Sequence, residues 1–131
     1  MKKKDKEIII ERKTFNIYGI KNDPTSHNLI ELLDHHELDY IFFDMRDFPP
    51  TDDQLRRWAD FEGEEYPING RNTIFKKKER FFLQLDEAAR RDWLREHYHV
   101  ISRPIVELKD EEVISIGGRP ERVFKTIAQY L

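Results

Sequence analysis

Residues 14–26, with the sequence TFNIYGIKNDPTS, decide the fold of this chain. Apolar and aromatic side chains alternate over the first seven of these positions, which predicts a β-strand. Asp23 and Pro24 then mark a strong helix start, with the aspartate as N-cap and the proline at the first helical position. Apolar residues follow at helical spacing to about His36. The stretch therefore predicts a strand that leads directly into a helix.

A second strand is predicted over residues 39–43, which are short and rich in β-forming side chains. A strand, a helix and a strand within ~30 residues form a βαβ unit, whose crossover makes the two strands parallel. After this unit, residues 51–54 (TDDQ) match a capping box, and Asp86 starts a further helix. Residues 64–75 are expected to be irregular.

The last third of the chain predicts a hairpin and a final helix. Residues 105–108 and 113–116 flank a charged tetrad, so we expect two antiparallel strands. Pro120 opens the last helix. The order β-α-β, helical insert, β-β-α predicts an α/β fold of the thioredoxin type, with a mixed sheet and a helical lobe over about residues 51–97. Six aromatic residues are expected in the core: Tyr18, Phe42, Phe43, Phe81, Phe82 and Phe124.

Composition limits the functions that this chain can have. Its 131 residues suit one domain, which we place at residues 14–131 after a charged extension at residues 1–13. The absence of cysteine excludes a disulfide scaffold, a cysteine-bound metal and any mechanism that needs a protein thiol. Residues 31–65 carry twelve acidic and three basic side chains, which argues against nucleic-acid binding. We expect a cytoplasmic protein without a membrane partner.

Five short motifs, taken in order, resemble one known family. The chain resembles the glutaredoxin-type arsenate reductase (ArsC) and Spx family, a branch of the thioredoxin-fold proteins, over about residues 14–131. The matching motifs are Tyr18-Gly19-Ile20, the loop at residues 23–28, Asn69-Gly70-Arg71, residues 101–106, and Gly118-Arg119-Pro120-Glu121. The resemblance implies a thioredoxin-like fold.

The chain departs from that family at its reactive position. The resemblance places the family's nucleophilic cysteine at Asp23, and the second cysteine of Spx-type regulators at Ser26. Reduction of arsenate or of a disulfide needs a thiolate that attacks and is then regenerated. A carboxylate and a hydroxyl cannot cycle in this way, so the redox activity of the family is not expected here.

Three arginines match family positions that surround an oxyanion: Arg71, Arg103 and Arg119. With Thr25 and Ser26 at the helix N-terminus they imply an anion-binding pocket, since guanidinium groups and backbone N–H groups both suit oxyanions. Arg103 precedes Pro104, which matches the family's cis-proline. For each arginine taken alone, a surface or fold-stabilising ion pair is the favoured interpretation, and only the three together point to a shared anionic pocket. Asp23 is compatible with two structural roles, a helix cap and a built-in anion among the arginines.

Two functions follow from this resemblance. The first is a redox-inactive binding or regulatory module, for which Spx-type proteins imply RNA polymerase as a protein partner. The alternative is an enzyme similar to a glutathione-dependent thiol transferase or reductase, in which Ser26 or Thr25 stabilises the glutathione thiolate. Apart from glutathione we expect no cofactor, and no metal. The pairs His35-His36 and His97/His99 are interpreted as exposed helix-end histidines rather than zinc ligands.

Overall fold

A mixed four-stranded sheet forms the centre of the computed structural model, which describes residues 14–131. The strands are β2 (Thr14–Gly19), β3 (Asp39–Asp44), β4 (Ile105–Leu108) and β5 (Val113–Ile116), in the order β3-β2-β4-β5. Strand β2 is parallel to β3 and antiparallel to β4, and β4 and β5 form the expected hairpin. The thioredoxin-like mixed sheet is thus confirmed. The predicted charged extension lies outside the described residues.

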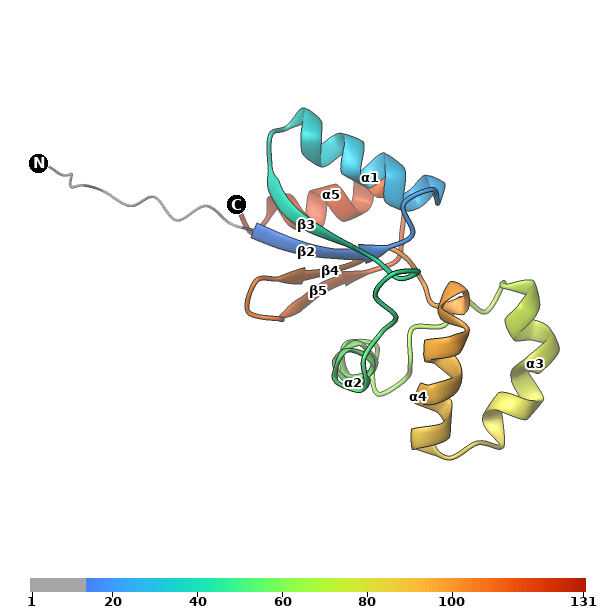
Figure 1. The fold of residues 1–131 in the computed structure, drawn as a ribbon. Helices are drawn as coiled ribbons and strands as arrows, with labels where there is room; N and C mark the ends of the chain where they lie inside the picture. The colour runs from blue at the N-terminus through green and yellow to red at the C-terminus, as the bar shows by residue number, and fades with distance from the viewer. Residues whose placement is uncertain (1–13) are drawn as a thin grey trace, which may run out of the picture.

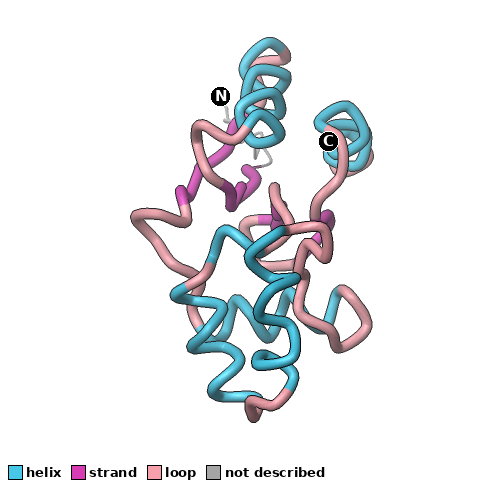
Figure 2. Tube along the Cα trace, turned by 90° about the vertical axis from the view of Figure 1, so that its right-hand side faces the viewer, coloured by secondary structure: helices cyan, strands magenta, loops and turns pink. Residues whose placement is uncertain are grey.

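Helices cover both faces of this sheet. Helices α1 (Pro24–His35) and α5 (Pro120–Ala128) lie side by side on one face (Figure 1). The other side carries the expected helical lobe, with α2 (Asp52–Phe61), α3 (Thr73–Leu83), α4 (Glu87–Glu96) and the short 3-10 helix η1 (Tyr98–Val100). Figure 2 shows this lobe in front of the sheet and below α1 and α5.

The sheet separates two hydrophobic cores, because neighbouring side chains of a strand point to opposite faces. In β4, Val106 faces the core under α1 and α5, whereas Ile105 faces the core shared with the lobe. Aromatic rings dominate the lobe core, and Trp58 is completely buried there. Phe81 does not join it, contrary to expectation, because its side chain remains 52% exposed on the outer face of α3.

Local hydrogen bonds explain where the lobe helices begin. The capping box of α2 is present, since the Gln54 N–H donates to Thr51 Oγ1 and the Thr51 N–H donates to Gln54 Oε1. The expectation of irregular structure over residues 64–75 is wrong from Thr73 onward. Asn72 caps α3 there, because its side-chain oxygen accepts from the Phe75 N–H at 3.0 Å.

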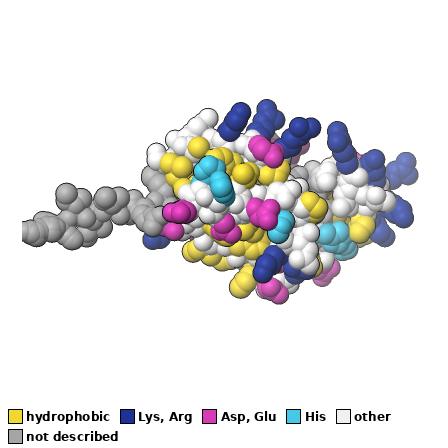
Figure 3. Space-filling view, turned by 90° about the horizontal axis from the view of Figure 1, so that it is seen from above, with side chains coloured by type: hydrophobic (Ala, Val, Ile, Leu, Met, Phe, Trp, Pro, Cys, Tyr) yellow, Lys and Arg dark blue, Asp and Glu magenta, His cyan; other side chains and the backbone are white. Residues whose placement is uncertain are grey.

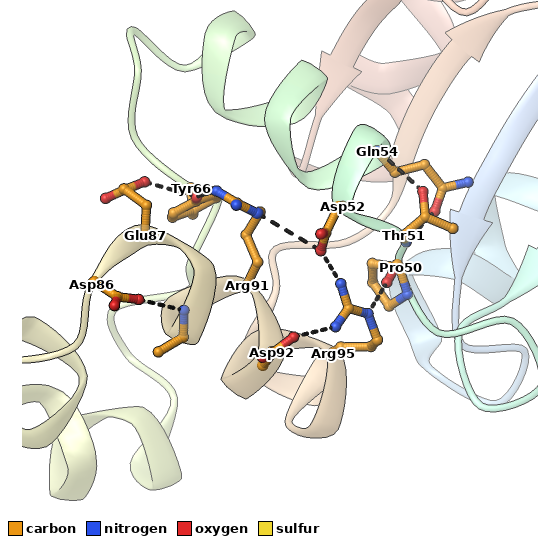
Figure 4. A network of polar contacts seen from close by, with 11 residues as sticks. Pro50, Thr51, Asp52, Gln54, Tyr66, Asp86, Glu87, Arg91, Asp92 and Arg95 are labelled. Atoms are coloured by element: carbon orange, nitrogen blue, oxygen red, sulfur yellow. Dashed lines mark hydrogen bonds and ion pairs between the residues drawn. The ribbon is translucent and has the colours of Figure 1, made fainter.

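Two arginines of α4 hold the lobe together at the start of α2 (Figure 4). Arg95 forms an ion pair with Asp52 and donates to the Pro50 carbonyl at 3.1 Å. Arg91 lies 3.7 Å from the Asp52 carboxylate and donates to the Tyr66 hydroxyl at 3.2 Å. Asp52 is also in the first turn of α2, where a negative charge is favoured. One carboxylate therefore both suits the helix terminus and fixes α4 against α2.

A carboxylate is buried between the sheet and α2. Glu107 of β4 is completely inaccessible to solvent. It accepts hydrogen bonds from the Trp58 indole N–H at 2.8 Å and the Tyr18 hydroxyl at 3.2 Å, and it forms an ion pair with Arg57 at 3.0 Å. A buried charge needs such partners, since its desolvation is otherwise very unfavourable. The sequence reading did not single out Glu107.

The phenol of Tyr18 is expected to make the protein less stable in strong alkali. Burial first, and then the charge of Glu107, raise the pKa of Tyr18 from 10.0 to about 12. Because the pKa of Tyr18 is higher in the folded than in the unfolded protein, the neutral phenol contributes to the free energy of unfolding. That contribution is complete below pH 10.0 and is lost as the pH rises towards about 12. Thermal unfolding across this range should show a smaller alkaline decline for Tyr18→Phe than for wild type. An identical decline in both proteins would contradict the prediction.

Candidate functional site

The candidate site begins at the loop between β2 and α1. Gly19 ends the strand, and the Asp23 N–H donates to the Ile20 carbonyl at 2.9 Å, which turns the chain towards α1. Ser26 is completely buried beneath this turn, and its Oγ accepts from the Ile20 N–H at 3.3 Å. A Cβ on Gly19 would lie only 2.3 Å from that Oγ. The close approach explains both the glycine and the inward direction of Ser26.

Asp44, at the end of β3, fixes the same loop from the other side. Its carboxylate accepts from the Lys21 N–H at 3.0 Å and pairs with the Arg46 guanidinium at 2.7 Å. Hydrogen bonding to Arg46 holds the pKa of Asp44 well below its usual range, and the backbone N–H of Lys21 acts in the same direction. The sequence reading missed Asp44, although a carboxylate at the end of a strand parallel to the site strand is a usable signal.

The Asp44→Asn variant should loosen the loop. An amide carries one acceptor oxygen with two lone pairs and no charge, so it cannot accept all four hydrogen bonds that Arg46 and the Lys21 N–H donate to Asp44. Hydrogen–deuterium exchange of the Lys21 amide is expected to become about tenfold faster, because the local opening that exposes it becomes easier. Asp47→Asn, on the exposed turn nearby, is the matched control. Unchanged exchange at Lys21 would show that Asp44 does not fix the loop.

Asp23 occupies the N-cap position of α1, but its side chain makes no capping hydrogen bond. The carboxylate instead faces Arg103, whose Nε donates to Asp23 Oδ2 at 3.1 Å. Both side chains are about four-fifths buried, with exposures of 21% and 19%. The interpretation of Asp23 as a side-chain helix cap is therefore wrong, because its carboxylate accepts from the Arg103 guanidinium and makes no capping hydrogen bond.

Arg103 is held in place by more than Asp23. Its Nη1 donates to the carbonyl oxygens of His99 at 2.9 Å and Ile101 at 3.2 Å. The Arg103–Pro104 peptide bond is cis, the isomer that the resemblance implies. The guanidinium is thus used by one carboxylate and two carbonyl groups of the protein itself.

The other two arginines lie on neighbouring segments. Residues near Arg71 pair with the chain before Arg103, through the Ile68–Ile101 bridge. Residues near Arg119 lie against the cis-proline, since the Gly117 N–H donates to the Pro104 carbonyl. The side chains of Arg71 and Arg119 are exposed, however. Within residues 14–131 no ion pair joins either one to Asp23, so only one of the three arginines contacts it.

The remaining predicted site residues divide by exposure. Thr25 is half-buried in the first turn of α1, whereas the hydroxyl of Ser26 lies in the interior, away from an external thiolate.

His97 and His99 are half-buried, so their interpretation as exposed histidines is wrong. The ring of His97 stacks on that of Trp93, with 4.1 Å between the ring centroids. Burial, and then the charges of His97 and Arg103, lower the pKa of His99. In the described part of the chain, no group of three or more histidine, cysteine, aspartate or glutamate side chains is arranged to hold a metal ion.

Comparison with solved structures shows which proteins share this fold. An arsenate reductase from Vibrio cholerae superposes with a TM-score of 0.70 and 21% identity, over 88% of this chain and 99% of that chain. The chain has the fold of an arsenate reductase. A protein related to arsenate reductase from Brucella melitensis also matches, with a TM-score of 0.62 and 26% identity, over 86% of this chain and 92% of that chain. The structural resemblance expected from the motifs is therefore confirmed.

Comparisons of the sequence alone find no relative, in contrast to the comparison of structures. No protein-family model matches the chain, and no curated protein matches it by sequence. Within residues 14–131, none of the helices has the length and apolar character needed to cross a membrane.

Proposed function

We propose that this protein is a redox-inactive relative of the arsenate reductases that works as a binding or regulatory module. The observation that carries the proposal is the Asp23–Arg103 ion pair at the N-terminus of α1, beside the cis-proline. The resemblance places the nucleophilic cysteine of the reductases at this position. Here the position holds a carboxylate that is already neutralised by an arginine of the same chain.

The chemistry of this pair supports a non-enzymatic role. A reductase needs a sulfur atom that forms and releases a bond to arsenic or to another sulfur. No cysteine occurs anywhere in the sequence to supply it. A carboxylate that attacked an oxyanion would bring two negative charges together, and the nearest guanidinium available to offset them already binds Asp23.

The anion pocket enters this proposal in a modified form. Arg103 already binds groups of the protein itself through Nε and Nη1, and Arg71 and Arg119 are exposed charges on adjoining loops. We propose that Asp23 is a resident anion of this region, so that sulfate, phosphate or arsenate binds only weakly to wild type. Thr25 and the first turn of α1 contribute polar groups beside it.

For the partner, the Spx resemblance favours a protein over a small molecule. RNA polymerase is the partner that this resemblance implies, and a cytoplasmic location goes with it. Binding of purified RNA polymerase from the source organism, followed by fluorescence anisotropy of the labelled protein, tests this part of the proposal. Saturable binding supports it, and a flat titration contradicts it.

The redox-inactive part of the proposal predicts an absence of turnover. Purified wild-type protein should not reduce arsenate or a disulfide with glutathione or thioredoxin as electron donor, and should not conjugate glutathione to a model electrophile.

Asp23→Ser should bind sulfate more tightly than wild type by about tenfold, because it frees the Arg103 guanidinium. Equal sulfate affinities of wild type and Asp23→Ser in calorimetry would refute the resident anion. Turnover above the buffer background would refute the redox-inactive role. Asp53→Ser, an exposed acidic residue remote from Arg103 in sequence, controls for net charge.

A further inference from the structure

The outer face of α3 combines exposed apolar groups with lysines. Ile74 and Phe81 lie seven residues apart, so they share one side of the helix, with Lys77 and Lys78 between them. The side chains of Ile74 and Phe81 are 43% and 52% exposed. These four residues, called here the basic face, are not the side on which α3 packs, because the buried residues of the helix are Phe75 and Phe82.

The positive charge of this helix is not compensated nearby. Residues 76–80 carry four basic side chains and one acidic side chain, all of them exposed. No ion pair within residues 14–131 uses these basic groups. Lysine and arginine side chains project from the end of the molecule where Figure 1 places α3 (Figure 3). The basic face is therefore a positively charged surface with two apolar anchors.

A second surface of the lobe has the opposite charge. Residues 60–65, called here the acidic turn, contain Asp60, Glu62, Glu64 and Glu65 and no basic residue. All four carboxylates are exposed, and within the described part of the chain none of them forms an ion pair. Phe61, in the middle of this charge, is 48% exposed. Each of the two surfaces thus offers unpaired charge beside a half-exposed phenylalanine.

A cleft of about 390 Å³ separates the acidic turn from α3. Its lining combines apolar side chains, Phe75, Phe82 and Leu83 among them, with the carboxylates of Glu64 and Glu65 and with the ion pair of Glu87 and Arg90 at 3.6 Å. The carboxylates of Glu64 and Glu65 leave this lining with excess negative charge. Leu83 is 56% exposed, so a side chain of another molecule can contact this part of the cleft. A lysine suits such a site, because its methylene groups pack against apolar walls while its ammonium group reaches a carboxylate.

We propose that two copies of this chain associate through their helical lobes, with the basic face of one copy on the acidic turn and cleft of the other. Both halves of the contact are present on one molecule, and their charges are opposite. A two-fold axis forms the contact twice and closes the dimer. Attraction between the charges orients the copies, and burial of the phenylalanines and Leu83 supplies apolar contact area. This inference goes beyond the proposed function and does not depend on it.

Sedimentation velocity of the full chain tests this dimer. At about 100 µM protein and about 20 mM salt we expect a dimer, and at about 500 mM salt we expect the Kd to rise about tenfold or more, because salt screens exposed charges. A monomer under the low-salt condition overturns the proposal. Under that result the basic face is left for an acidic partner of another kind.

Charge reversal identifies the surfaces. Lys77→Glu/Lys78→Glu and Glu64→Lys/Glu65→Lys should each be monomeric, because like charges then face each other. An equimolar mixture of the two variants should form a one-to-one dimer, because one of its two contacts is the wild-type contact and the other has both charges reversed, so both are complementary. Lys109→Glu/Lys125→Glu changes the net charge by the same amount as Lys77→Glu/Lys78→Glu, at exposed positions elsewhere, and should remain dimeric. Circular dichroism confirms that each variant is folded. A mixture that stays monomeric, or a control that loses its dimer, refutes the assigned contact.

Discussion

Replacing Arg57 with methionine is expected to lower the free energy of unfolding by about 3–5 kcal/mol, because it leaves a buried charge without its ion-pair partner. Glu107 has no access to water, and Arg57 is the one cation that reaches its carboxylate in the described structure. Trp58 and Tyr18 donate hydrogen bonds to Glu107 but carry no charge. Urea denaturation measures the loss.

Two further variants separate charge from packing. Arg57→Met/Glu107→Gln removes both charges and keeps an acceptor for the Trp58 indole, so it should recover more than half of the lost stability. Arg56→Met, at the exposed neighbouring position, should change stability by less than about 0.5 kcal/mol. A loss below about 1 kcal/mol for Arg57→Met would mean that Glu107 does not depend on this arginine.

A cysteine at position 23 is expected to be unusually reactive. In Asp23→Cys the sulfur lies at the N-terminus of α1 and replaces the carboxylate that faces Arg103. The guanidinium and the helix dipole both favour a thiolate, so the thiol pKa should fall by about 1–2 units and alkylation by iodoacetamide at neutral pH should accelerate about tenfold. The dependence of the alkylation rate on pH measures this pKa.

The controls for this thiol use adjacent positions. Asn22→Cys places an exposed thiol one residue before the helix cap and should react at an ordinary rate. Asp23→Cys/Arg103→Met should lose most of the gain if Arg103 is its source. Equal rates for the cysteines at positions 22 and 23 would show that the N-terminus of α1 does not stabilise an anion at residue 23.

Much of the fold could be predicted because its signals are local. Pro24 fixes the start of α1, the capping box of Thr51 and Gln54 starts α2, and a charged tetrad joins the two strands of the hairpin. The motif around Pro104 indicated a cis bond, which the structure contains. The cis bond was implied by the family resemblance. In the other cases a few neighbouring residues determine the backbone, so a single sequence contains the necessary information.

The parts that could not be predicted depend on distant partners. The Asp23 carboxylate can cap α1 or bind a cation, and only the position of Arg103, 80 residues later, decides between them. Glu107 lies in a strand with apolar neighbours, and nothing local distinguishes a buried, paired carboxylate from an exposed one. The start of α3 at Thr73 was missed because the capping Asn72 follows a loop of turn-forming residues.

The order of the strands in the sheet has a consequence for synthesis on the ribosome. Strand β4 lies between β2 and β5, yet Glu107 follows Tyr18, its hydrogen-bond partner, by 89 residues. At a synthesis rate of roughly 5–20 residues per second, Glu107 of β4 is made about 4–18 s after Tyr18 of β2. During that interval the edge of β2 that β4 later covers is unpaired, and Trp58, once it is made, lacks its acceptor Glu107. Assembly of the sheet, and closure of the lobe onto it, are thus expected to be nearly post-translational events.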